Sequence, residues 1–60
     1  MTRKDYVLIA EAMREARLWI ADQTPNAVAA WMIAVKALAT ALHRDNPRFD
    51  RERFYAACGL

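Results

Sequence analysis

Residues 27–42, AVAAWMIAVKALATAL, carry one charge, Lys36, and lie in the middle of a 60-residue chain. Alanine and long aliphatic residues dominate the stretch and no glycine or proline interrupts it, so it predicts a helix. A helix that is apolar around most of its circumference must be covered on most sides. A chain this small buries only about 60% of the surface that its unfolded form exposes. We therefore expect a homo-oligomer, with a dimer favoured.

The side-chain spacing gives this central helix two apolar surfaces. Its bulky face consists of Val28, Trp31, Met32, Val35, Leu38, Ala39 and Leu42. A separate strip of methyl groups consists of Ala30, Ala34, Ala37 and Ala41. A bulky face suits a core filled from several elements, whereas an alanine strip lets another helix backbone approach closely.

The N-terminal segment predicts an amphipathic helix from Arg3 to about Ala21, with Thr2 as N-cap and Asp5 in the first turn. Its predicted core face consists of Tyr6, Ile9, Ala10, Met13, Ala16, Arg17 and Ile20. A strip beside the core face consists of Leu8, Ala12 and Trp19. Val7 and Leu18 are two further apolar positions, and both sets are candidates for a surface that binds a partner.

Turn signals divide the remainder of the chain. Thr24 and Pro25 predict the start of the central helix, which should end near Arg44 because Asn46 precedes a proline. A short third helix should follow and dock onto the other two, since it is too short to be stable alone.

Capping residues define this third helix, which we expect from Arg51 to Cys58. Asp50 is the expected N-cap and Gly59 the expected C-cap. Phe49 and Phe54 occupy the positions of a hydrophobic staple. Residues 1–60 are thus predicted to form one all-α domain of two long helices and a short C-terminal helix.

The reactive side chains are few. Cys58 is the only cysteine and His43 the only histidine, so neither an intramolecular disulfide nor an ordinary four-ligand zinc site can form. We interpret Cys58 as a small buried apolar residue and His43 as a surface or capping residue. Glu11 and Glu15 fit a solvated helix face. We expect no enzyme activity, no catalytic or metal-binding residues and no cofactor.

The net charge of +2 arises from nine basic and seven acidic residues. The C-terminal part has a slight basic excess, from Arg44, Arg48, Arg51 and Arg53. Acidic residues are interleaved with these arginines, which weakens the case for a nucleic-acid interface. A small DNA-binding or regulatory protein is therefore the alternative function, and nucleic acid the less favoured partner.

A protein interface is the favoured interpretation of the remaining apolar residues, because so small a chain does not easily enclose two tryptophans and both apolar surfaces. Tryptophan is enriched at the energetic centres of interfaces, so Trp31 is the first candidate. The predicted interface comprises Trp31, Met32, Val35, Leu38, Trp19 and Leu8. We predict no membrane span, because residues 27–42 are shorter than the roughly 20 residues required and contain Lys36.

Both ends of the chain resemble a family of small proteins encoded in bacteriophages and prophages. The resemblance rests on MTRKDYVLIA at residues 1–10 and, more specifically, on DNPRFDRERFYAACG at residues 45–59. It implies a phage origin and action in the bacterial cytoplasm, on a host or defence protein. It implies no activity, and no functional residue follows from it.

Overall fold

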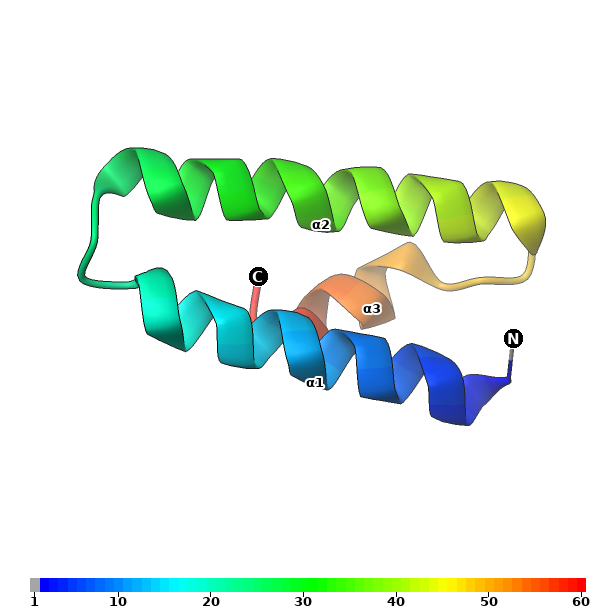
Figure 1. Cartoon of the computed structure of the whole chain (residues 1–60). Coiled ribbons are helices and arrows are strands. Elements are labelled where there is room, and N and C mark those ends of the chain that lie inside the picture. The colour runs from blue at the N-terminus through cyan, green and yellow to red at the C-terminus, as the bar shows by residue number, and fades with distance from the viewer. Residues whose placement is uncertain (1) are drawn as a thin grey trace.

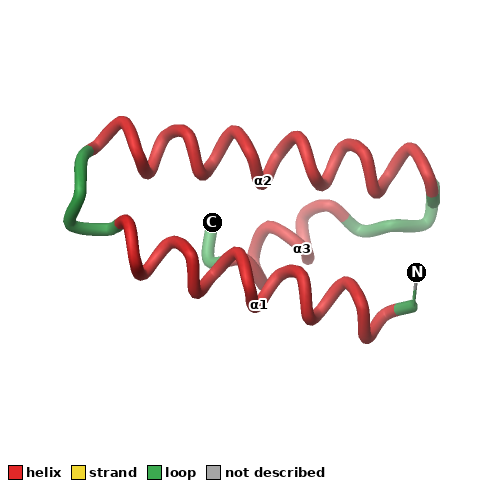
Figure 2. Tube along the Cα trace, viewed as in Figure 1, coloured by secondary structure: helices red, strands yellow, loops and turns green. Residues whose placement is uncertain are grey.

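The computed structural model describes residues 2–60, where the regular elements are three helices: α1 (Arg3–Ile20), α2 (Pro25–Asp45) and α3 (Arg51–Cys58). Helices α1 and α2 form a long antiparallel pair, and α3 folds back along one side of that pair (Figure 1). Short loops join the three helices (Figure 2). The prediction of an all-α, three-helix fold is confirmed for this part of the chain.

Local hydrogen bonds set the ends of α1. The backbone N–H of Thr2 donates to Oδ2 of Asp5 at 3.0 Å, and the Thr2 hydroxyl donates to the same oxygen at 3.3 Å. This acidic residue also lies at the positive end of the helix dipole. At the other end, the N–H of Gln23 donates to the carbonyl of Ile20 at 3.1 Å, and the helix ends one residue earlier than the sequence predicts.

Helix α2 begins as its sequence predicts. Oγ1 of Thr24 accepts a hydrogen bond from the N–H of Ala27 at 3.0 Å, and Pro25 occupies the first helical position. The N–H of Asn46 closes the last turn on the carbonyl of Leu42 at 2.9 Å. Asn46 then turns to an extended conformation, as expected of a residue before proline, and α2 ends one residue later than predicted.

Helix α3 has both predicted caps. The Asp50 carboxylate accepts from the N–H of Arg53 at 3.1 Å, and Gly59 takes the left-handed conformation at φ 87°. The rings of Phe49 and Phe54 lie 5.3 Å apart between centroids, as a hydrophobic staple requires. These contacts fix the angle at which the chain enters α3.

The core forms where α3 meets the two long helices. Helix α1 packs more extensively against α3 than against α2, so the short helix holds the long pair together. The buried residues are Ala10, Trp31, Val35, Ala39, Leu42, Phe49, Phe54 and Cys58. The predicted core face of α1 is confirmed by the half-buried side chains that pack on this cluster, Tyr6, Ile9, Met13, Ala16 and Ile20.

Candidate interaction surface

Two of the six predicted interface residues belong to the core of the single chain. Trp31 is 6% exposed and Val35 is fully buried. The indole Nε1 of Trp31 donates to the backbone carbonyl of Met13 at 2.8 Å, which satisfies its only polar atom. Assigning Trp31 and Val35 to an interface between copies is thus corrected, because α1 and α3 together cover this part of the bulky face of α2.

The other four predicted interface residues lie nearer the surface. Leu38 is half-buried at the edge of the core. Leu8 and Trp19 are exposed on α1, Trp19 to 73%, and Met32 is 38% exposed on α2. These residues remain available for contact with another molecule.

The alanine strip of α2 is open to solvent along its length. All four of its residues are exposed: Ala30, Ala34, Ala37 and Ala41. Only 22% of the most apolar 18-residue stretch of α2 is buried. Two surfaces were predicted for this helix, and the chain covers one of them.

Helix α1 carries an exposed strip on the same side of the molecule. Leu8, Ala12 and Trp19 are exposed and, at 3.6-residue spacing, lie on the opposite side of the helix from buried Ala10. Figure 1 shows α3 on one side of the α1–α2 pair. Helical periodicity places the α1 strip and the alanine strip away from the residues that pack on α3, so both strips lie on the other side of the pair. We call the two strips together the hairpin face: Leu8, Ala12, Trp19, Ala30, Ala34, Ala37 and Ala41.

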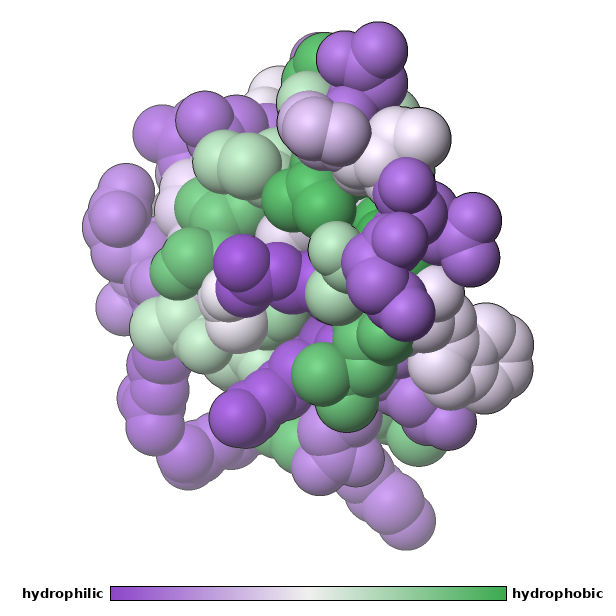
Figure 3. Space-filling model, turned by 90° about the vertical axis from the view of Figure 1, so that its left-hand side faces the viewer, coloured by the Kyte–Doolittle hydropathy of each residue, from purple (hydrophilic) through white to green (hydrophobic). Residues whose placement is uncertain are grey.

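The seven residues of the hairpin face are uncharged, but the exposed Glu15 lies in line with its α1 strip, between Ala12 and Trp19. The small side chains of the hairpin face leave it flat, and Leu8 and Trp19 form a bulkier border on α1. Hydrophobic side chains also reach the surface at the end of the molecule that carries the α1–α2 turn, where polar side chains surround them (Figure 3).

The single chain exposes more surface to solvent than a typical folded monomer of its mass, as expected if a partner covers part of it. The chain exposes 4582 Å², whereas a folded monomer of its mass exposes about 4,000 Å². Its radius of gyration is 11.6 Å, against about 10.4 Å for a compact domain of this length. The single chain therefore exposes about 600 Å² more than a typical monomer.

The predicted nucleic-acid contacts are all exposed but do not form one surface. Arg48 and Arg53 line a pocket between the α2–α3 connection, α3 and the start of α1, whereas Arg44 and Arg51 do not. The pocket also contains Arg3, which the sequence analysis did not select. No local pattern could select it, because Arg3 reaches the pocket only through the packing of α1 on α3.

The reactive side chains are not brought together. Helix α3 runs back from the C-terminal end of α2, so that Gly59 lies beside Arg17, which in turn lies over Trp31. Cys58 is therefore at the level of Trp31, about 18 Å along α2 from His43. Burial raises the pKa of the Cys58 thiol, which disfavours the reactive thiolate.

Groups of three or more potential metal ligands are absent from residues 2–60. Helix α2 is long and apolar enough, by length and composition alone, to cross a membrane. The prediction that the chain has no membrane span was based on residues 27–42, a shorter segment than the 21-residue helix that forms.

No family description, curated protein or solved structure matches this chain. The resemblance to phage-encoded proteins therefore stays a prediction, and the function is argued from the surfaces above.

Proposed function

We propose that this protein self-associates through the hairpin face and acts by binding other proteins rather than by catalysis. The exposed alanine strip, which lies beside a bulky face that the chain covers itself, is the observation that supports this most directly. Small side chains let two helix backbones approach closely, so the preferred cover for such a strip is another helix.

A second copy of the chain is the occupant that best fits the hairpin face. A twofold interface pairs the same patch on both subunits, so the alanine strip of α2, which is uncharged, is complementary to itself. Pairing two α1–α2 hairpins face to face would make two stacked layers of two helices, with α3 on the outside of each subunit. The excess exposed surface of about 600 Å² approaches the roughly 800 Å² that each partner buries in a standard interface.

Membrane insertion of α2 is less consistent with its packing. Trp31, Val35 and Ala39 are buried against α1 and α3, and insertion would remove this cover. Lys36 would also lie near the middle of the bilayer, where a charge is costly.

A host or defence protein is the proposed further partner, and the bacterial cytoplasm the proposed location. Both rest on the resemblance of the chain's two ends to phage-encoded proteins. The alternative of DNA binding rests on the exposed arginines at positions 44, 48, 51 and 53. It requires affinity that falls steeply with salt, because each phosphate contact releases a counterion.

Sedimentation equilibrium on matched alanine variants tests the interface. Ala34 is on the hairpin face, whereas Ala29 is exposed on the same helix outside it. We expect the wild-type protein to form a dimer. Ala34→Glu should raise the dimer dissociation constant at least about 100-fold, because it buries a charge from each subunit in the interface. Ala29→Glu should leave the dissociation constant close to that of the wild type. A wild-type monomer at high concentration, or equal effects of the two substitutions, would rule out this interface.

Two further experiments distinguish self-association from DNA binding and from membrane insertion. Dimerisation driven by apolar burial should persist at high salt, whereas binding of a DNA duplex that disappears as salt is raised would support the alternative function. Flotation of the protein with phosphatidylcholine vesicles, in place of a soluble dimer, would identify α2 as a membrane segment.

A further inference from the structure

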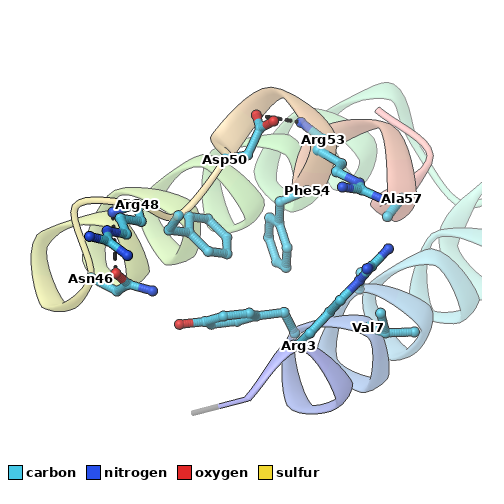
Figure 4. A pocket seen from close by; sticks show the side chains of 11 residues that line it. Arg3, Val7, Asn46, Arg48, Asp50, Arg53, Phe54 and Ala57 are labelled. Atoms are coloured by element: carbon cyan, nitrogen blue, oxygen red, sulfur yellow. Dashed lines mark hydrogen bonds between the residues drawn. The ribbon is translucent and has the colours of Figure 1, made fainter.

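A pocket of about 300 Å³ lies on the α3 side of the molecule, away from the hairpin face. The start of α1, the α2–α3 connection and α3 each contribute to its wall (Figure 4). Its volume is at the lower end of the range of about 300 to 1,000 Å³ that is typical of small-molecule sites. One or two rings are therefore the size of ligand that it could enclose.

The wall of the pocket is aromatic and held in place by packing. Tyr6 and Phe49 meet edge to face at 4.8 Å between ring centroids, and Phe54 lies 5.3 Å from Phe49. Phe49 is 9% exposed and Phe54 4%, so both rings are fixed by the core. Val7, which is exposed, extends the apolar wall along α1. The pocket is thus formed before any ligand arrives.

Positive charge surrounds this apolar wall. Arg3, Arg48 and Arg53 line the pocket, with Asp50 as its only acidic residue. One oxygen of Asp50, Oδ1, accepts the backbone N–H of Arg53 at the start of α3. Three guanidinium groups against one carboxylate make the pocket attractive to an anion.

Two of these guanidinium groups converge from different helices. Figure 4 shows the side chain of Arg3 extending from α1 and that of Arg53 from α3, so that their charged ends approach each other beside Phe54. Like charges at close range repel, and an anion between them would relieve that repulsion. Arginine also binds carboxylate and phosphate through paired N–H donors.

We propose that this pocket binds a small organic anion, a carboxylate or phosphate monoester attached to an aromatic ring. Arg3 and Arg53 bind the anionic group, and the ring packs against Phe54 and Val7. Nucleic acid is disfavoured as the occupant, because a pocket of about 300 Å³ encloses one or two rings, whereas single-stranded nucleic-acid sites follow several nucleotides of the backbone.

Phenyl phosphate is a suitable probe, and benzyl alcohol is its neutral counterpart. Titration of each into the ¹⁵N-labelled protein, followed by two-dimensional NMR, should give saturable shifts around the pocket for phenyl phosphate only. The expected dissociation constant is on the order of 0.1 to 1 mM, as for other ligands of this size. Inorganic phosphate should bind at least about tenfold more weakly, because it lacks the ring.

Matched arginine variants complete the test. Arg3→Gln and Arg53→Gln should each weaken phenyl phosphate binding about tenfold, since each removes a charged donor. Arg51→Gln removes the same charge from the same end of α3 outside the pocket and should leave binding unchanged. Equal weakening by Arg51→Gln and Arg53→Gln, equal binding of benzyl alcohol, or shifts confined to the hairpin face would overturn the proposal.

Discussion

The guanidinium carbon of Arg17 lies 5.4 Å from the centre of the Trp31 ring, and Nη1 of the same side chain donates a hydrogen bond to the carbonyl of Gly59. Arg17 belongs to α1, Trp31 to α2, and Gly59 caps α3. One long side chain thus contacts all three helical segments at the point where the chain ends.

Replacement of Arg17 by methionine should destabilise the fold. Methionine keeps much of the apolar stem but loses both the bond to the Gly59 carbonyl and the cation–π contact. The expected loss is about 1 to 2 kcal/mol. A 60-residue domain has a total stability of about 3 to 9 kcal/mol, so urea unfolding followed by circular dichroism will resolve the change.

The control for this prediction is Lys4→Met. Lys4 is an exposed cation on the same helix, and its replacement should change the free energy of unfolding by less than about 0.5 kcal/mol. If the two variants are equally stable, the contacts of Arg17 do not hold the C-terminal helix in place.

Burial of the Cys58 thiol predicts a dependence of stability on alkaline pH. Burial raises the thiol pKa in the folded state above its value in the unfolded chain. Below the unfolded pKa the thiol is protonated in both states and contributes nothing to the pH dependence. Above it, the unfolded chain releases the proton first, so the free energy of unfolding falls as pH rises, by at most about 1.4 kcal/mol per pH unit.

Urea unfolding between pH 7.5 and 10 checks this prediction, with Cys58→Ala as the reference. The reference variant retains every other ionisable group of the chain. The stability difference between wild type and Cys58→Ala should change steadily in favour of the variant as pH rises. Parallel pH curves would show that the folded thiol ionises as readily as the unfolded one.

The sequence predicted the ends of the helices well, because each helix end depends on residues that are close together in the chain. Thr24, Asp50 and Gly59 cap helices through contacts within three or four residues, which a sequence displays directly. The alanine strip was equally visible, since helical period alone defines it. Whether a strip is covered, however, depends on how distant segments pack.

Long-range packing explains what the sequence analysis missed. Trp31 was predicted at an interface because tryptophan favours such sites, but the return of α3 placed it in the core. The pocket unites Arg3 with Arg48 and Arg53, which are more than forty positions away. No spacing rule links these residues, because the link arises only when α1 packs on α3.

Trp19 provides a direct optical test of the hairpin face. In Trp31→Phe it is the only tryptophan. Phenylalanine keeps a ring in the core and loses the bond to the Met13 carbonyl, at a cost of about 1 kcal/mol, so the variant should still fold. Trp19 is 73% exposed in the single chain, and its fluorescence should therefore be that of an indole in water at low protein concentration.

Raising the concentration should move that emission to shorter wavelength, because pairing of hairpin faces removes Trp19 from water. The shift should follow the same concentration dependence as dimer formation in sedimentation. Adding Ala34→Glu to Trp31→Phe should abolish the shift without changing the helix content. If a dimer forms while the emission stays constant, Trp19 lies outside the interface and the hairpin face does not pair as proposed.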